Sequence, residues 1–260
     1  MQKQNPVLNG LFILILALVT REALADDAPK IKVQLVTEEL PPLQTQTKRG
    51  VEGYTLDLLR EVLATTGDDY DVQLMPWARA YQKALKEPNV LIFSITRLPS
   101  REALFHWIGP IGVEVNAYFW TLKTRPELTF TNLKAARSFK TVVPRVQPEL
   151  PKLLSHGFRE GDNLTIVNNL DQSIPMLLTG RVDFIYGGDL YYNYLAAQGK
   201  LNLALLNKRQ DEDSISDILY LAFSLATPKE RVSRYQAALR QVHDSGYLSE
   251  LRRKWFSSQP

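Results

Sequence analysis

The sequence predicts an α/β protein with two lobes, between which the chain crosses twice. Apolar runs typical of buried strands alternate with amphipathic helical stretches. The alternation falls into two series, separated by extended segments at 113–122, at 201–206 and at 218–224. Three consecutive strand-helix units in the first series favour a largely parallel sheet. Two such series joined by extended segments indicate two lobes with two crossing hinge segments.

The first series supplies the elements of the first lobe. We expect strands at 31–36, 70–74 and 90–95, and helices at 54–66, at 77–86 and, short, from Pro99 and Ser100. Gly67 stops the first of these helices. After the second series, the polar run 207–217 predicts a surface loop, and helices at 228–244 and 247–255 follow.

The second series supplies the elements of the second lobe. We expect strands at 139–143, 164–167 and 182–186, and helices at 148–156, 170–179 and 189–198. Thr131 is the expected cap of a preceding helix, and Gly157 ends the helix at 148–156. Pro175 makes the helix at 170–179 irregular. We therefore place residues 26–115 and 209–260 in lobe 1, and residues 116–208 in lobe 2.

The amino terminus has the pattern of a secretory signal peptide. Lys3 precedes an apolar run from Leu11 to Val19, and the small-residue pattern Ala23-Leu24-Ala25 follows it. The run is too short for a membrane span, which needs about 20 apolar residues. We expect cleavage after Ala25 and export to the periplasm, with a retained anchor as the alternative.

Composition excludes several classes of function. The sequence has 31 basic and 28 acidic side chains. Two of the basic and one of the acidic side chains lie before Asp26, so residues 26–260 carry a formal net charge of +2. This balance, with dispersed basic residues, argues against a nucleic-acid partner. The sequence has no cysteine, which excludes disulfides, thiol catalysis and thiolate metal sites. The core must therefore form by burial alone.

The residues resemble those of one family over nearly all of residues 26–260. The stretch SITRLPSREALFHWIGPI, from Ser94 to Ile111, resembles the strand, Thr-x-x-x-x-Arg turn and aromatic tail of the family 3 bacterial extracellular solute-binding proteins, the amino-acid ABC transporter type. GYTLDLLREV, from Gly53 to Val62, resembles the family's first helix, and the segment from Tyr220 to Trp255 resembles its return strand and closing helices. The resemblance implies a type II periplasmic binding protein fold, with two lobes that close on a ligand.

Arg101 is the main candidate for a ligand carboxylate. It follows a buried strand at the predicted start of a helix, where backbone N–H groups favour an anion, and its guanidinium can form two parallel bonds to a carboxylate. The resemblance implies this role for Arg101 and a ligand contact for Thr96. A plain surface pair of Arg101 with Glu102 or Glu61 is the alternative. Arg97 is the rival anchor.

Three further parts of lobe 1 belong to the predicted ligand site. Trp77, at a strand-to-helix junction, can form a flat apolar wall, although an aromatic ring also packs well there. The resemblance places residues 37–40, among them Glu39, in the first ligand loop. Arg79 is a second arginine that can face the ligand.

The predicted contribution of lobe 2 is weaker. The resemblance implies an aspartate that holds the ligand's ammonium, and Asp189 lies at the corresponding strand-to-helix turn, one residue later than the family spacing. Asp189 can equally be an N-cap. Gln147 and Glu149 open another helix, where the family donates backbone groups to the carboxylate.

The sequence contains no catalytic constellation that we recognise. His106, His156 and His243 are scattered, and no HExxH, G-x-S-x-G or phosphate-binding glycine loop is present. We expect no enzyme activity, no metal and no cofactor. The expected partners are a small amino acid or carboxylate and a membrane permease, and we expect a monomer. The alternatives are a cyclohexadienyl-dehydratase-like enzyme, with Glu38 or Glu39 as the acid, and a ligand-sensing module for a membrane receptor.

Overall fold

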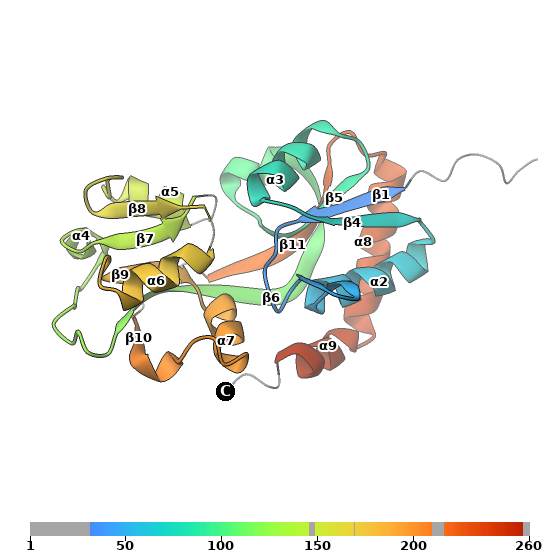
Figure 1. The fold of residues 1–260 in the computed structure, drawn as a ribbon. Helices are drawn as coiled ribbons and strands as arrows, with labels where there is room; N and C mark the ends of the chain where they lie inside the picture. Colours follow the sequence, from blue (N-terminus) through green and yellow to red (C-terminus); the bar gives the residue numbers. More distant parts are fainter. Residues whose placement is uncertain (1–31, 146–148, 169, 210–215, 257–260) are drawn as a thin grey trace, which may run out of the picture. The chain divides into compact units, whose positions relative to one another are not determined.

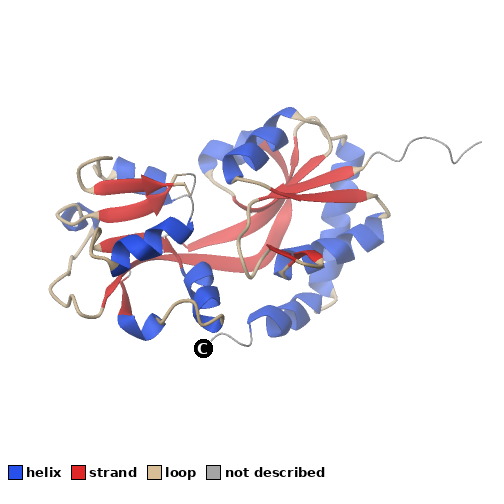
Figure 2. Ribbon diagram, viewed as in Figure 1, coloured by secondary structure: helices blue, strands red, loops and turns tan. Residues whose placement is uncertain are grey.

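The structure is a computed structural model that describes residues 32–145, 149–168, 170–209 and 216–256. The predicted signal peptide lies outside these residues. Figure 1 shows the elements in order along the chain, and Figure 2 shows how helices and strands alternate. Among the described residues, no helix is both long and apolar enough to cross a membrane.

A sheet of nine strands forms the centre of the described chain. Its strand order is β4-β1-β5-β11-β6-β9-β7-β8, with β10 paired to β6. β1 pairs in parallel with both β4 and β5, and β7 pairs in parallel with β8 and β9. The strands are β1 (Val33–Thr37), β4 (Tyr70–Leu74), β5 (Val90–Thr96), β6 (Phe105–Leu122), β7 (Thr141–Pro144), β8 (Leu164–Val167), β9 (Phe184–Gly188), β10 (Leu206–Arg209) and β11 (Ser216–Ser224).

Two strands connect the parallel groups. β11 pairs antiparallel with β5 and with β6, and β6 continues to pair antiparallel with β9 and β10. β6 is 18 residues long, whereas strands of globular proteins usually have about 3 to 10 residues. The predicted extended segments at 113–122 and 218–224 are therefore the inner strands of one continuous sheet.

The helices fill the connections between the strands. A small hairpin of β2 (Thr45–Thr47) and β3 (Gly50–Glu52) precedes the first helix. The helices are α2 (Tyr54–Thr66), α3 (Trp77–Lys86), α4 (Leu133–Ala136), α5 (Glu149–Ser155), α6 (Ser173–Leu178), α7 (Asp189–Ala197), α8 (Lys229–Asp244) and α9 (Tyr247–Phe256), with 3₁₀ turns η1 (Pro99–Leu104), η2 (Leu170–Gln172) and η3 (Leu203–Leu205).

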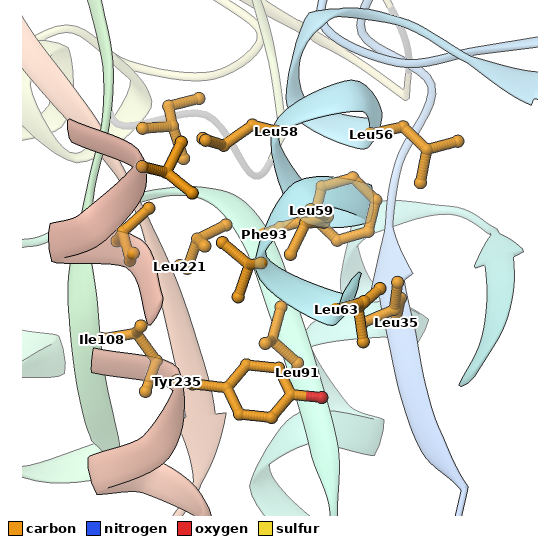
Figure 3. Close-up of a cluster of buried hydrophobic side chains, with 14 of the residues drawn as sticks. Leu35, Leu56, Leu58, Leu59, Leu63, Leu91, Phe93, Ile108, Leu221 and Tyr235 are labelled. Atoms are coloured by element: carbon orange, nitrogen blue, oxygen red, sulfur yellow. The ribbon is translucent and has the colours of Figure 1, made fainter. Parts of the chain in front are cut away.

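Buried apolar side chains form four clusters. The largest lies between the β1–β5–β11 sheet and helices α2 and α8, and Figure 3 shows Leu59, Phe93 and Tyr235 within it. A second cluster, around α3, contains Trp77. The buried members of both clusters all come from residues 33–113 and 219–256. The other two contain only buried residues from 117–206.

Several predicted elements differ from the structure. The run at 201–206 is not extended, because a 3₁₀ turn occupies Leu203–Leu205. Part of the predicted loop at 207–217 is strand, since β10 pairs with β6 and β11 already begins at Ser216. Asn132, not Thr131, caps α4, because its side chain accepts a hydrogen bond from the Ala135 N–H. The helix at 170–179 is split into η2 and α6.

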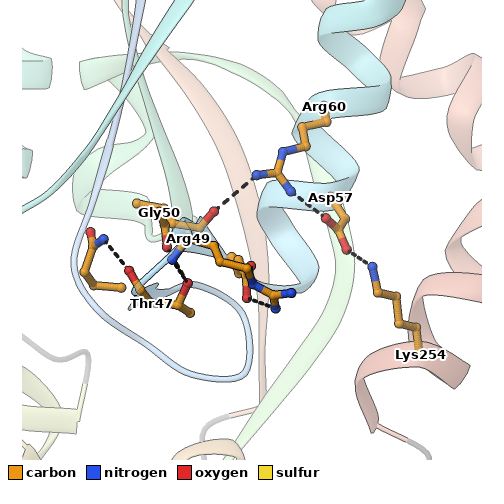
Figure 4. Close-up of polar contacts among 9 residues, drawn as sticks. Thr47, Arg49, Gly50, Asp57, Arg60 and Lys254 are labelled. Atoms are coloured by element: carbon orange, nitrogen blue, oxygen red, sulfur yellow. Dashed lines mark hydrogen bonds and ion pairs between the residues drawn. The ribbon is translucent and has the colours of Figure 1, made fainter.

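One carboxylate of α2 binds two side chains of the last helix. Figure 4 shows Asp57 between Arg60 and Lys254. Its Oδ2 accepts hydrogen bonds from Lys254 Nζ at 2.8 Å and from Trp255 Nε1 at 2.9 Å, and its Oδ1 accepts one from Arg60 Nη1 at 3.0 Å. Burial raises the pKa of Asp57, but these donors outweigh burial and hold the pKa below its usual value. The closing helix α9 is therefore linked to α2 through Asp57.

Candidate functional site

The ends of four parallel strands meet at the candidate site. Thr37 ends β1 and Leu74 ends β4, and Glu38 and Met75 follow them directly. In the second parallel group, Arg145 follows β7 and Asn168 follows β8. In open α/β sheets, ligands bind outside the carboxyl ends of the parallel strands. These ends line two hollows in the structure.

The first hollow, called here the Trp77 hollow, has a volume of about 540 Å³. It is lined by Glu38, Glu39, Leu74, Met75, Pro76, Trp77, Ala78, Arg145 and Asn168. One wall is apolar, because Trp77 is 7% exposed and packs in the α3 cluster. Two carboxylates, a guanidinium and the Asn168 amide are its polar groups. This combination of a mainly apolar surface with a few polar groups is typical of small-molecule sites.

The second hollow, called here the α7 hollow, has a volume of about 500 Å³. It is lined by Glu38, Glu39, Pro41, Thr45, Gln46, Pro144, Asn168, Leu170, Asp171, Tyr191, Tyr194, Leu195 and Lys200. Tyr191 and Tyr194 are three positions apart on α7, and residues at this spacing share a helix face. The two hollows have Glu38, Glu39 and Asn168 in common.

A buried polar network holds the loop that carries Glu38 and Glu39. Ser94 Oγ donates to Gln44 Oε1 at 2.8 Å, and Gln44 Nε2 donates to the Glu38 carbonyl at 3.2 Å. Thr37 Oγ1 donates to the Phe93 carbonyl at 2.8 Å. Since buried polar groups that satisfy one another restrict the backbone to one arrangement, the network positions both glutamates.

Arg101 lies against the aromatic wall of the Trp77 hollow. Its guanidinium carbon is 6.0 Å from the Trp77 ring centroid and 5.3 Å from that of Tyr81, and Nη1 donates to the Thr96 carbonyl at 3.2 Å. Three predicted positions, Arg101, Thr96 and Trp77, are therefore neighbours. The sequence predicts a helix start at Arg101 that favours an anion. That prediction was wrong, because η1 is a 3₁₀ turn of six residues with little dipole.

Arg97 is bound to another partner. Its Nε donates to Glu102 Oε2 at 2.8 Å, and its guanidinium carbon lies 5.3 Å from the Trp107 ring centroid and 5.6 Å from that of Tyr220. Glu102 thus pairs with Arg97, the rival anchor. An arginine in such a pair and between two rings is less available to a ligand carboxylate.

Asp189 lies at a different place from the two hollows. It is the first residue of α7, and Gly188 is the N-cap, so the N-cap interpretation of Asp189 was wrong. Burial raises the pKa of Asp189, and Lys208 and the backbone N–H groups of Asn116 and Leu190 oppose this rise. Asp189 is not among the residues that line either hollow.

The remaining predicted positions contribute little to the two hollows. Glu149 is buried at the start of α5, and Gln147 lies outside the described residues. Arg79 is exposed on α3 and is not among the residues of the Trp77 hollow. Glu39 lines both hollows, and its Oε1 accepts a hydrogen bond from Thr45 Oγ1 at 2.5 Å.

Sequence reasoning missed Arg145, Asn168, Asp171, Tyr191 and Tyr194. Arg145 and Asn168 could have been found, because each is the first polar residue after a predicted parallel strand of lobe 2. The two tyrosines carry no such sign, since the face of α7 that meets the hollow depends on packing.

Each histidine contacts a different backbone carbonyl. His106 Nε2 is 3.2 Å from the Leu225 carbonyl, His156 Nδ1 is 2.9 Å from the Lys152 carbonyl, and His243 Nε2 is 3.0 Å from the Pro110 carbonyl. Each contacts backbone. In the part of the chain that the structure describes, no three His, Asp or Glu side chains are grouped as metal ligands.

Solved structures of binding proteins share this fold. The arginine-, lysine-, histidine-binding protein ArtJ from Geobacillus stearothermophilus has a TM-score of 0.75 and 20% identity, covering 88% of this chain and 97% of that one. A histidine kinase sensor domain with similarity to periplasmic binding proteins has a TM-score of 0.75 and 16% identity, covering 86% and 96%. A periplasmic His/Glu/Gln/Arg/opine family-binding protein from Silicibacter pomeroyi, in complex with lysine, has a TM-score of 0.68 and 14% identity, covering 86% and 97%.

These likenesses establish the fold, which is the mixed α/β type II periplasmic binding protein fold. None of the curated proteins matches the sequence. Residues 33–258 match the family described as bacterial extracellular solute-binding proteins, family 3. This match covers most of the chain and confirms the resemblance seen in its residues: the chain belongs to family 3 of the bacterial extracellular solute-binding proteins.

Proposed function

We propose that this chain is an exported periplasmic protein that captures a small amino-acid-like or carboxylate solute and delivers it to an ABC permease. The observation that carries the proposal is the pair of hollows at the carboxyl ends of β1, β4, β7 and β8, in a chain of a solute-binding family. The structural neighbours that bind arginine, lysine or histidine support an amino-acid ligand.

The proposed lobes are residues 26–115 with 209–260, and residues 116–208. Support comes from the buried members of the clusters, which in two clusters all come from 33–113 and 219–256 and in the other two all come from 117–206. Leu190, which is only partly buried, packs across this division against the largest cluster. A ligand that contacts Trp77 and Arg145 touches both lobes. Its preference for the closed arrangement then shifts the population toward closure, and the closed form is what the permease binds.

Within this site, Arg101 is the proposed carboxylate anchor, with Thr96 and Trp77 beside it and Glu39 on the opposite loop. Support comes from the contact of Arg101 with Trp77, which lines a hollow. Arg145 lines the same hollow directly and is the competing anchor. Asp189 keeps its proposed role toward an ammonium only if the ligand reaches the start of α7.

Thermal unfolding of residues 26–260 with a panel of amino acids, dicarboxylates and small peptides tests the proposal. A ligand that binds only the folded chain at 100 times its Kd stabilises it by about 2.7 kcal/mol. At least one compound is expected to raise the Tm, and a panel without any shift contradicts the proposal.

The same protein is expected to be monomeric and not to turn over prephenate or arogenate. Export with cleavage after Ala25 predicts that the mass of the mature protein equals that of residues 26–260.

A sensory role is the second candidate, because a histidine kinase sensor domain is among the structures with this fold. Such a module binds its ligand in the same way but contacts a receptor. Co-purification of the ligand-loaded protein with membrane proteins distinguishes the two, since a permease and a receptor kinase are identified by mass.

A further inference from the structure

Charge is unevenly distributed between the two hollows. The α7 hollow has three carboxylates, those of Glu38, Glu39 and Asp171, against the single ammonium of Lys200. The Trp77 hollow adds the guanidinium of Arg145 and a wall formed by Trp77 and apolar side chains. Because Glu38 and Glu39 line both hollows, carboxylates outnumber basic groups by two in the α7 hollow and by one in the Trp77 hollow. The α7 hollow is therefore the more favourable of the two for a cation of the solute.

The carboxylates of the α7 hollow are oriented by neutral donors. Glu39 accepts a hydrogen bond from the hydroxyl of Thr45, and Asp171 accepts one from the hydroxyl of Tyr191. A hydroxyl fixes the direction of a carboxylate but does not cancel its charge. Both carboxylates thus keep a charge that a cation of the solute can neutralise at close range.

The aromatic side chains of this hollow favour the same kind of group. Tyr191 is buried and Tyr194 is half-buried on the face of α7 that lines the hollow. The faces of tyrosine rings attract ammonium and guanidinium groups. Carboxylates and tyrosine rings from two different parts of the chain, the loop after β1 and the η2–α7 region, therefore act on one volume of about 500 Å³.

We propose, on the basis of the function proposed above, that the solute is an amino acid with a cationic side chain, whose guanidinium or ammonium group binds in the α7 hollow between Glu39 and Asp171. The carboxylate end of the solute then lies toward the Trp77 hollow, which Arg145 lines and whose Trp77 ring Arg101 contacts. A solute with one carboxylate and a distant cation satisfies both hollows, whereas an acidic amino acid places a second negative charge beside Glu39.

Calorimetric titration of residues 26–260 tests this assignment with matched pairs of compounds. Arginine is compared with citrulline, and lysine with norleucine, because each pair has nearly the same shape and differs in side-chain charge. The diamine putrescine supplies the cation without the carboxylate. We expect arginine or lysine to bind about thirty-fold or more tightly than its uncharged match, the range given for a desolvated charge pair, and putrescine to bind more weakly than either.

Two conservative variants link the preference to the named residues. Asp171→Asn and Glu39→Gln keep the shape of the side chain and remove its charge, and each is expected to weaken binding of the basic amino acid at least about tenfold. Glu61→Gln removes a charge from the exposed face of α2 and is expected to change the affinity little. Unchanged melting temperatures without ligand show that the variants fold.

The outcomes separate this proposal from the function on which it rests. If citrulline, norleucine, glutamine or glutamate binds as tightly as the basic amino acids, the cationic assignment is wrong and the solute-binding function stands. If Asp171→Asn and Glu39→Gln both bind arginine normally, the cation does not lie in the α7 hollow. If dicarboxylates or small peptides bind and no amino acid does, the cationic assignment is wrong and the solute-binding function stands; if no compound of the whole panel binds, both proposals fail.

Discussion

The carboxylate of Asp57 on α2 accepts a hydrogen bond from the indole Nε1 of Trp255 on α9, at 2.9 Å. The two residues are 198 positions apart in the sequence. The same oxygen accepts a bond from Lys254 at 2.8 Å. This one acidic side chain therefore links α9 to α2, beside the ring contact of Tyr54 with Phe256 at 5.2 Å.

Replacing Asp57 by asparagine is expected to destabilise the protein by about 1.5 to 3 kcal/mol, the range for a buried hydrogen bond to a charged group. An asparagine retains one acceptor oxygen but loses the charge that attracts Lys254 and Arg60. Urea unfolding measures the change, with Glu61→Gln on the same helix as the control. Equal free energies of unfolding for Asp57→Asn and the native chain would show that the hydrogen bonds of Asp57 add no stability.

Asp57 also predicts how stability depends on pH. Its pKa is held below the usual value in the folded chain, so between the two pKa values the unfolded chain binds more protons. The contribution of Asp57 is therefore complete above about pH 4, the ordinary value for an aspartate, and is lost as the pH falls through the lowered pKa. Urea unfolding from pH 6 to pH 2 should show a flatter decline for Asp57→Asn. Parallel curves for the two proteins argue against this role.

Gly53 is expected to tolerate no side chain. Its φ is +143°, and an added Cβ would lie 2.2 Å from the Leu43 carbonyl oxygen. Gly53→Ala should therefore cost more than about 3 kcal/mol of stability, through backbone strain and displacement of the loop that carries Glu38 and Glu39. Gly67→Ala is the matched control, because φ is +70° there and nothing lies within 4 Å, so only about 1 kcal/mol is expected. Thermal unfolding compares the two, and similar losses would refute the steric explanation.

Three arginine variants test the carboxylate anchor. Arg101→Ala is expected to weaken ligand binding by about 2 to 5 kcal/mol, or roughly thirty-fold to several thousand-fold. Arg101→Lys should recover only part of this loss, because an ammonium lacks the planar fork of a guanidinium. Arg97→Ala should bind normally, since Arg97 is paired with Glu102. Calorimetric titration measures the affinity of each variant. If Arg101→Ala binds the ligand normally and Arg145→Ala does not, the arginine that binds the ligand carboxylate is Arg145.

Most of the fold could be predicted because its elements are encoded locally. The helix at 54–66 and its stop at Gly67 were found where predicted, since the apolar spacing and the left-handed glycine both lie within one short segment. β10 was missed, because Leu206–Arg209 is largely polar and becomes a strand only by pairing with β6. Pairing with a distant strand leaves no local pattern.

The site could be predicted only in part. Trp77 was predicted from its position at a strand-to-helix junction and Glu39 from the family resemblance, and both line hollows. Tyr194 could not be predicted, because its contribution depends on the rotation of α7. Glu102, the partner of Arg97, is only five residues away in the sequence. The pair was nevertheless missed, because the 3₁₀ turn that brings the two side chains together was predicted only as a short helix.

Small-angle X-ray scattering with and without saturating ligand tests most directly whether a solute closes the two proposed lobes. β6 and β11 both connect the two parallel groups and allow a hinge. With the ligand identified by thermal unfolding, we expect a smaller radius of gyration for the native chain and no change for a variant that cannot bind. Identical scattering profiles with and without saturating ligand would contradict capture by closure.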